Sequence, residues 1–341
     1  MKKLFPILLF FFGTFLFAQN VSFETLLNDK ISIRALEIYN NKVWYSGTDS
    51  KFGYVDLKNT KNQKQIKLSE KKLQFRTLAQ DKSSFYAINI ESPAYFFKID
   101  KKKLTHEIVF TDTVKTAFYD ALHFVNTKFG ITFSDPDENL NFKIAILLPE
   151  KKVFDFLNTG FTNHDRIKLK KGEAAFAASN TNISSYDNTV WIATGGASSR
   201  IFKMKDMSWE VFELPFIQGE SSQGIYSIDF LDDKFGIAVG GDYKKQDANI
   251  NNIATTMDGG KTWEIQASGK NAGYMTCVKI KPGSKGKEII AVGDQHISYS
   301  SDFGKTWKEI SDEKGLFVCE WIDNKTVVFA GKDRIVKMKI D

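Results

Sequence analysis

Few residues in this sequence have the chemistry of disulfides, metal sites or rigid turns: its 341 residues include 2 Cys, 4 His and 6 Pro. Two cysteines cannot build a disulfide framework or a cysteine-rich zinc site. The histidines (His106, His123, His164 and His296) form no HExxH motif and no pair four residues apart. The sequence also has no P-loop and no GxGxxG turn between a strand and a helix. We therefore expect no metal site and no bound cofactor.

Long hydrophobic runs are also scarce, because the sequence has only one, at its start. The basic Met1-Lys2-Lys3 precedes an almost wholly apolar run over residues 4–17, and the small Ala18 follows. This order predicts a secretory signal peptide over residues 1–18, which is too short for a membrane span. We expect the protein to lie outside the cytoplasm, in a periplasm or outside the cell, without a transmembrane anchor.

The excess of positive over negative side chains is small. The full chain has 47 Lys and Arg against 41 Asp and Glu, and loss of residues 1–18 leaves a net charge of +4. No basic motif with interleaved aromatic residues accompanies it. This charge is too weak to indicate a nucleic-acid-binding protein.

What the sequence does contain is a repeat. Two segments, 256–263 and 300–307, share the pattern Ser/Thr-x-Asp-x-Gly-x-Thr-Trp and lie 44 residues apart. This pattern is the Asp-box, or BNR repeat, and it is typical of a hairpin turn in which the Asp accepts hydrogen bonds and the Gly takes a positive φ. We assign it a structural role. Its defining residues are Asp258, Gly260, Thr262 and Trp263 in the first segment, and Asp302, Gly304, Thr306 and Trp307 in the second.

A fainter repeat covers the rest of the chain. Short stretches with the pattern apolar–X–small–apolar recur seven times, 42 to 53 residues apart, and a second apolar strand follows each one. The residues at position X are Arg34, Arg76, Asp120, Glu173, Tyr226, Met275 and Phe317. Seven units of short strands without helical periodicity predict an all-β fold, a seven-bladed β-propeller.

The two ends of the chain fit the same prediction. After residue 315 there is room for only three strands, and the missing outer strand can come from residues 21–27 near the start of the chain. We therefore predict one domain over residues 19–341, a propeller closed by its N-terminal strand. The predicted blades lie near residues 31–68, 70–112, 115–158, 170–214, 221–268, 272–311, and 314–341 together with 21–27.

Several phrases of the sequence resemble a known family. They are found at residues 118–122, 130–136, 172–183, 194–200, 222–230 and 240–243. These phrases are similar to the photosystem II stability/assembly factor-like propellers, which belong to the BNR/Asp-box superfamily together with the sialidases. The resemblance implies a seven-bladed propeller outside the cytoplasm, and the photosynthetic members of the family help to assemble a membrane complex by binding partner proteins. The early blades depart from the pattern: the Asp at the end of residues 55–56 and of residues 99–100 is not followed by the Gly and Trp of the Asp-box.

The X residues predict a candidate site, because the innermost strand of each propeller blade lines the central channel. Five of them form a polar set: Arg34, Arg76, Asp120, Glu173 and Tyr226. In one interpretation the charges pair into a network that seals the channel. In the other they form a socket for an anionic ligand or for a side chain of a partner, in which Arg recognises a carboxylate.

An enzymatic alternative uses the same residues. A sialidase-like glycoside hydrolase needs an arginine cluster, a Tyr–Glu nucleophile pair and an acid/base Asp, and Tyr226, Glu173 and Asp120 supply these types. The sequence has only five Arg in all and no Phe/Tyr-Arg-Ile-Pro signature. We therefore assign no catalytic residue and favour a non-catalytic scaffold, a monomer that binds a protein or an envelope-associated assembly.

The two cysteines, Cys277 and Cys319, occupy matching places in adjacent units of the repeat. Adjacent blades can hold such residues too far apart for a disulfide, so we expect two separate buried thiols.

Overall fold

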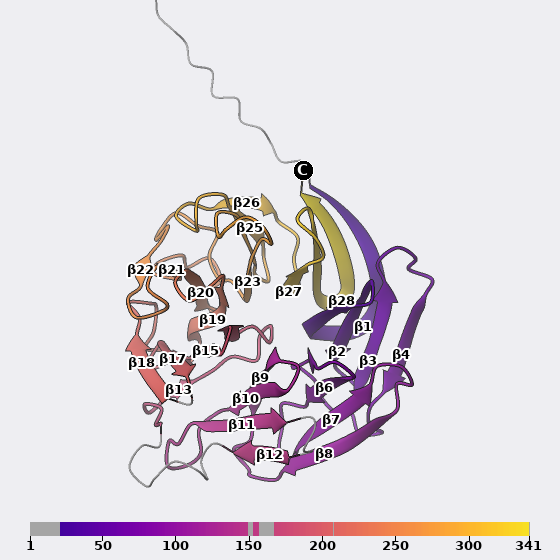
Figure 1. Ribbon diagram of the computed structural model, residues 1–341. Helices are drawn as coiled ribbons and strands as arrows, with labels where there is room; N and C mark the ends of the chain where they lie inside the picture. The colour runs from indigo at the N-terminus through magenta and orange to yellow at the C-terminus, as the bar shows by residue number, and fades with distance from the viewer. Residues whose placement is uncertain (1–20, 149–152, 157–166, 207, 341) are drawn as a thin grey trace, which may run out of the picture.

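The computed structural model describes residues 21–148, 153–156, 167–206 and 208–340, and the predicted signal peptide lies outside these ranges. The described residues form 28 strands. Figure 1 shows the sheets arranged around a central axis, with β9, β19, β23 and β27 toward the centre and β4, β8, β18, β22 and β26 at the periphery. Within the described ranges no helix is long and apolar enough to cross a membrane.

Four of the sheets have four strands each. The first contains β5 (Ala79–Gln80), β6 (Ser84–Ile88), β7 (Ala94–Asp100) and β8 (His106–Asp112). The second contains β9 (Tyr119–Asn126), β10 (Phe129–Ser134), β11 (Lys143–Leu148) and β12 (Val153–Phe156). The third contains β14 (Ile183–Tyr186), β15 (Thr189–Ala193), β17 (Arg200–Lys205) and β18 (Ser208–Glu213). The fourth contains β23 (Cys277–Ile280), β24 (Ile289–Val292), β25 (Ile297–Ser300) and β26 (Lys308–Ser311).

The other two sheets have six strands each. One has the order β27 (Leu316–Trp321), β28 (Thr326–Ile340), β1 (Val21–Tyr39), β2 (Lys42–Gly47), β3 (Lys51–Asp56) and β4 (Gln63–Lys67). The other has the order β13 (Glu173–Ala174), β16 (Gly195–Gly196), β19 (Gln223–Phe230), β20 (Gly236–Asp242), β21 (Ile253–Thr256) and β22 (Glu264–Ile265).

The number of blades corrects the sequence-based prediction. The described strands form six sheets, so the propeller has six blades, and the prediction of seven is wrong. The cause is the length of two strands: β1 has 19 residues and β28 has 15. Each continues through a place where the sequence suggested a break, and the predicted first and last blades therefore share one hydrogen-bonded sheet. Within that sheet Val21, near the start of the chain, lies opposite Ile340 at its end.

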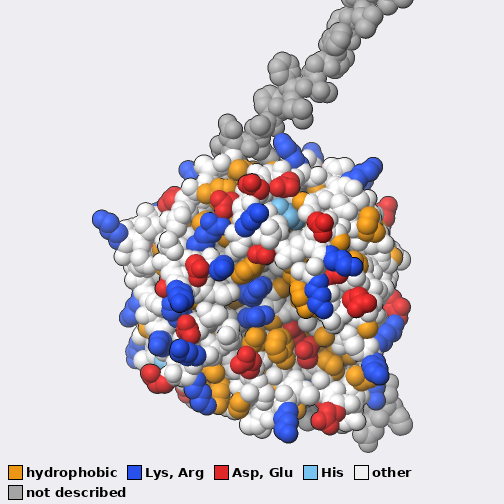
Figure 2. Space-filling view, turned by 180° about the vertical axis from the view of Figure 1, so that it is seen from behind, with side chains coloured by type: hydrophobic (Ala, Val, Ile, Leu, Met, Phe, Trp, Pro, Cys, Tyr) orange, Lys and Arg blue, Asp and Glu red, His pale blue; other side chains and the backbone are white. Residues whose placement is uncertain are grey.

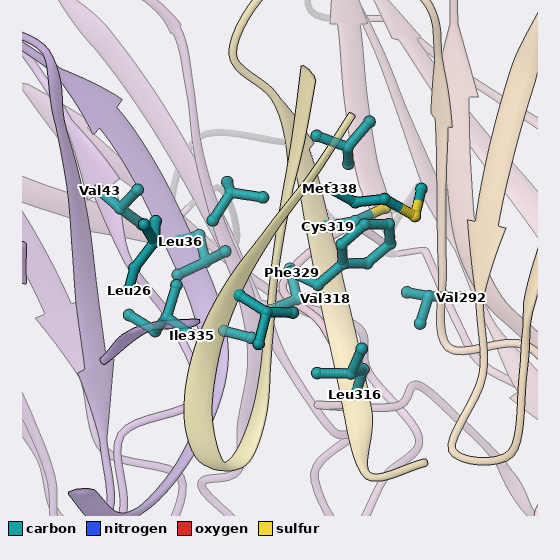
Figure 3. Packing of buried hydrophobic residues seen from close by; sticks show 14 of the residues in the cluster. Leu26, Leu36, Val43, Val292, Leu316, Val318, Cys319, Phe329, Ile335 and Met338 are labelled. Atoms are coloured by element: carbon teal, nitrogen blue, oxygen red, sulfur yellow. The ribbon is translucent and has the colours of Figure 1, made fainter. Parts of the chain in front are cut away.

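The hydrophobic core is divided among the interfaces between neighbouring sheets. Each of six clusters of buried residues in the described chain joins strands of two adjacent sheets, and together they follow the ring all the way round. Figure 3 shows one of them, in which Phe329 of β28 and Val318 of β27 face Val292 of β24. Burial of apolar area in these interfaces stabilises the ring, and side-chain hydrogen bonds between neighbouring sheets add to it, for example from the amide of Val278 to Ser227.

Candidate functional site

At several positions X of the repeat, the inner strand has one residue more than the strand it pairs with. In the pairing of β1 with β2, Ile33 and Ala35 have partners in β2 and Arg34 between them has none. The same interruption occurs in β9, β19 and β27. The residues skipped there are Asp120, Tyr226 and Phe317. A β-bulge of this kind bends a strand and redirects the side chain of the extra residue. The repeated sequence pattern thus corresponds to a repeated bulge.

A short segment, Ala177–Thr181, which joins β13 to β14, crosses the channel. Its side chains hydrogen-bond to the inner strands of several blades. Asn180 Nδ2 donates to the carbonyls of Leu78 (2.8 Å) and Leu122 (3.1 Å), and Ser179 Oγ donates to that of Thr276 (2.6 Å). Thr181 and Ser227 share a hydroxyl hydrogen bond of 2.7 Å. A segment that bonds to strands all around the ring must lie on its axis, and it divides the channel into two ends.

Arg34 and Arg76 lie at one of these ends, which we name the arginine mouth. Arg34 Nη1 donates to the carbonyl of Ala178 (3.1 Å), and Arg76 Nη1 donates to that of Ala177 (3.4 Å). Arg34 also packs over the ring of Phe317, with 4.0 Å between Cζ and the ring centroid. Among the ion pairs of the described chain, none includes either arginine. Burial and repulsion by Arg76 lower the pKa of Arg34 to about 10.

Asp120 lies deeper at the same end and is fully buried. Neither of its carboxyl oxygens has a hydrogen-bond partner of ordinary geometry, although the amide of Ala177 is close enough to act on its pKa. Burial and the neighbouring Asp135 raise the pKa of Asp120 well above its usual value, and Arg76 offsets only part of this. Burial also raises the pKa of Asp135 to about 6. The buried Asp120 carboxyl is thus biased toward its neutral form.

Glu173 does not line the channel with the arginines, although the repeat predicted it there. It lies in β13, beside β16, and pairs with Arg200 of β17: Arg200 Nε and Nη2 donate to its carboxylate at 2.9 and 2.5 Å. Thr194 Oγ1 and the amide of Lys170 complete its hydrogen bonds. Arg34, Arg76, Asp120 and Glu173 therefore do not form the predicted salt-bridge network.

Aromatic residues fill the channel beside the crossing segment. Tyr226 stacks on Phe176 with 3.8 Å between ring centroids, and Tyr274 meets it edge to face at 4.8 Å. The hydroxyl of Tyr226 donates to the carbonyl of Ser222 (2.8 Å). Met275, by contrast, is buried between blades, so Tyr274 takes the channel position that the sequence assigned to its neighbour. Tyr226 shares no hydrogen bond with Glu173, and these contacts do not assemble a sialidase-like Tyr–Glu pair.

The opposite end of the channel contains a chamber of about 340 Å³. Residues of the crossing segment form part of its wall, and its ionisable lining comes from five inner strands. These side chains are Glu37, His123, Asp229, Lys279 and Glu320. Lys279 Nζ and Glu320 Oε2 form an ion pair at 2.6 Å. We name this cavity the acidic chamber, because it has three carboxyl groups and one lysine.

Burial changes the proton affinities in the acidic chamber. It raises the pKa of Glu37 to about 7, even though Gln80 donates a hydrogen bond to the carboxylate. It raises the pKa of Asp229 to about 6, and it lowers the pKa of His123 to about 4. The pKa of Lys279 is raised, because attraction to Glu320 and Asp229 outweighs its burial.

Sequence reasoning missed the acidic chamber, but a signal for it exists. Four of its five ionisable residues lie three positions after the bulge of an inner strand, and Lys279 of β23 is the exception. The pairs are Arg34 and Glu37, Asp120 and His123, Tyr226 and Asp229, and Phe317 and Glu320. Side chains three positions apart face opposite sides of a regular strand, and the bulge changes this alternation. A single inner strand thereby contributes to both ends of the channel.

The two Asp-box segments fold into the same turn, remote from the channel. Asp258 accepts hydrogen bonds from the amide and hydroxyl of Thr262 (2.9 and 2.7 Å), and Asp302 accepts the same pair from Thr306 (2.9 and 2.6 Å). Gly260 and Gly304 have φ values of 88° and 78°, which favour glycine. The equivalent tryptophans donate from Nε1 to these glycine carbonyls. Every polar group of the Asp residues is used within the turn, as a structural role requires.

A metal site is not evident in the described ranges, where no three His, Cys, Asp or Glu side chains gather closely enough to hold an ion. Asp242, at the end of β20, accepts hydrogen bonds from the amide of Lys244 (2.9 Å) and from Gln223 Nε2 (3.3 Å).

Sheets arranged around an axial channel define this chain as a β-propeller. No protein-family model matches its sequence, and no curated protein does either. Among solved structures, YCF48 bound to D1 peptide is similar with a TM-score of 0.66, at 11% identity over 94% of this chain and 97% of that one. YCF48 from Cyanidioschyzon merolae gives 0.64, at 11% identity over 93% and 98%. Streptogramin B lyase gives 0.67, at 14% identity over 94% and 98%. Identities this low establish a shared fold only.

Proposed function

We propose that this chain is an exported, non-catalytic β-propeller that binds a protein partner at the arginine mouth. The partner's contact is a carboxylate, either an Asp or Glu side chain or a chain terminus. The observation that carries this proposal is that, within the described chain, no carboxylate lies within ion-pair distance of Arg34 or Arg76. A guanidinium group offers a planar set of donors that fits a carboxylate with two parallel hydrogen bonds.

The energetics of the two arginines favour binding. Their contacts are backbone carbonyls and an aromatic ring, which hold the side chains in place without neutralising them. Burial disfavours the charged form of each guanidinium; Arg76 also repels Arg34, and Asp120 and Glu91 offset only part of the burial of Arg76. An incoming carboxylate relieves both costs, so attraction to an anionic partner is stronger here than at an exposed arginine.

The surroundings also suit a peptide. Phe317, against which Arg34 packs, is only partly buried and provides apolar contact area beside that charge, whereas Tyr226 and Tyr274 are buried in the channel. On the face shown in Figure 2, Lys or Arg side chains lie near the centre beside a group of hydrophobic side chains. Buried aromatic and arginine anchors carry much of the energy in protein interfaces. The similar structure of YCF48 contains a bound D1 peptide, so this fold can present a peptide-binding surface.

The proposal can be tested with short synthetic peptides that contain Asp or Glu and end in a free carboxylate. Each peptide is compared with an amidated form in which Asp and Glu are replaced by Asn and Gln. We expect the acidic set to contain binders, and the double variant Arg34→Ala/Arg76→Ala to bind them at least about tenfold more weakly, since charged hydrogen bonds contribute about 1.5–3 kcal/mol each. Titration by fluorescence anisotropy measures both affinities.

The control is Arg334→Ala, which removes an arginine that is already paired with Glu313 at 2.7 Å. It lowers the net charge but leaves the arginine mouth unchanged, so its affinity should match that of the wild type. Equal weakening in the control and in the double variant would indicate nonspecific attraction by net charge. Binding of the neutral peptides as tightly as the acidic ones would contradict the proposal.

Export rests on residues 1–18. If the segment is a signal peptide, N-terminal sequencing of the protein from outside the cytoplasm gives a start near residue 19. Recovery of the chain in the cytoplasm with Met1 intact would contradict export.

A further inference from the structure

The only two cysteines of the chain lie in contact. Cys277 is in β23 and Cys319 is in β27, and their Sγ atoms are 3.8 Å apart. Cys277 Sγ also lies 3.7 Å from the carbonyl oxygen of Cys319. Both side chains are fully buried and are free thiols. The sequence-based expectation that adjacent blades hold the two residues apart is wrong, because their sulfur atoms are in contact.

The contact joins two sheets that share no hydrogen-bonded strand pair. β23 belongs to the four-stranded sheet β23–β26, and β27 belongs to the six-stranded sheet that contains both ends of the chain. The interface between them is the hydrophobic cluster of Figure 3, where Cys319 lies among Val318, Phe329 and Met338. A covalent bond here would add a link between two sheets that are now held together by packing, by the ion pair of Lys279 with Glu320 and by side-chain hydrogen bonds.

We propose that Cys277 and Cys319 are a modification site, at which a disulfide links the inner strands of these two blades. Formation of the bond requires the sulfurs to approach from 3.8 Å to about 2.05 Å. This inference does not depend on the proposed binding function. It requires an oxidising compartment, which the predicted export of the chain would supply.

The chemistry requires an external disulfide as the oxidant, either a small molecule such as glutathione disulfide or a protein disulfide. The thiolate of Cys277 attacks one sulfur of glutathione disulfide, which forms a mixed disulfide and releases one glutathione thiolate. The thiol of Cys319 then loses its proton and attacks Cys277 Sγ, and the second glutathione leaves. Two protein thiols are oxidised, one glutathione disulfide is reduced, and the two protons end on the two glutathiones.

The surroundings of the two thiols differ in the folded protein. Burial opposes ionisation of both thiols. For Cys277, the neighbouring Cys319 thiol and the charge of Lys279 outweigh burial and lower the pKa. For Cys319, burial and the proximity of Cys277 raise the pKa well above its usual value. Because both thiols are fully buried in the folded protein, the oxidant reaches them during folding, before the interface closes and before these shifts exist. The sequence of steps therefore holds equally with the two cysteines exchanged.

The test is to refold the denatured, reduced chain in a mixture of reduced and oxidised glutathione, and then to alkylate free thiols under denaturing conditions. Intact-mass measurement is expected to show a monomer with no alkyl group and a mass about 2 Da below the reduced chain, since two hydrogens are lost. Proteolysis without reductant should release one peptide pair that contains both cysteines. Loss of the bond should lower the melting temperature by roughly 5 °C, because it closes a loop of some 40 residues.

The single variants Cys277→Ala and Cys319→Ala separate the bond from the packing of the side chains. Reductant should lower the melting temperature of the wild type but leave that of each variant unchanged. If a variant fails to fold, the mass measurement on the wild type still decides the question. Two alkylated thiols in refolded protein, a stable mixed disulfide with glutathione, or a bond between two chains would each overturn the proposal.

Discussion

The two ends of the channel are built by the same inner strands and yet have opposite chemistry. The arginine mouth has two cations without a carboxylate partner, fixed by backbone carbonyls and Phe317. The acidic chamber has three carboxyl groups, and its one lysine is paired with one of them. The segment Ala177–Thr181 separates the two ends. The difference teaches that charges on the channel wall do not pair by default: Lys279 and Glu320 form an ion pair at one end, whereas the two arginines at the other end are in none of the ion pairs of the described chain.

The largest expected loss of stability comes from mutation of Glu173, in the strand β13 that precedes the crossing segment. Glu173→Ala leaves Arg200 buried without its partner, and such a change costs about 3–5 kcal/mol. Denaturant unfolding measures the loss. The control is Glu213→Ala, whose ion pair with Lys170 is exposed, so that its loss should change the stability much less than loss of Glu173. Equal losses in the two variants would show that Glu173 does not hold this part of the channel.

A smaller effect is expected at Asn180, which holds the crossing segment between the two ends. Asn180→Ala removes three hydrogen bonds, two to Leu122 of β9 and one to the carbonyl of Leu78. It also puts an alanine at a φ of 61°, a left-handed conformation that alanine adopts less readily than asparagine. We expect a loss of about 2–3 kcal/mol in unfolding free energy. Asn180→Gly loses the same bonds without the backbone strain, so it should be less destabilising by about 1 kcal/mol. If both variants unfold like the wild type, the segment does not depend on this residue.

The acidic chamber predicts a pH effect. The pKa of Glu37 rises from 4.5 in the unfolded chain to about 7 in the folded protein. The folded state therefore binds this proton more tightly, and stability falls as pH rises through this window. Glu37→Gln removes the titrating group. Relative to this variant, the wild type should lose about 1–2 kcal/mol between pH 4.5 and pH 7.

The same pH series needs two comparisons. His123 opposes the effect of Glu37, since its lowered pKa removes stability as pH falls from 6.5 toward 4. Only the difference between Glu37→Gln and the wild type isolates the carboxyl group. The exposed Glu70 provides a control, because Glu70→Gln should leave the pH profile unchanged. A difference that does not vary with pH would contradict burial of Glu37.

Part of this architecture could be predicted from the sequence. The all-β propeller follows from the repeat, and the bulges at Arg34, Asp120, Tyr226 and Phe317 coincide with position X. The number of blades was wrong because periodicity locates strands but does not tell where one strand ends. β1 and β28 continue through such places and merge two predicted units into one sheet.

The rest depends on tertiary contacts. The stretch around Glu173 has the same local pattern as the inner strands, but β13 has two residues and pairs with β16 instead. Met275 fits the pattern and is buried between blades. The crossing segment had no sequence signal, because its hydrogen bonds go to strands far away in the chain. The acidic chamber could be predicted only once the bulges were known, since each bulge changes which residues of the strand face the channel.

The most direct test of the central claim is thermal unfolding of Arg34→Ala/Arg76→Ala with and without an acidic peptide that binds the wild type. Without peptide, we expect a melting temperature within about 2 °C of the wild type, because the arginines have no ion pair to lose. With peptide, the melting temperature of the wild type should rise and that of the variant should not. A large fall without peptide, together with equal shifts on adding it, would show that the arginines stabilise the ring and do not bind the partner.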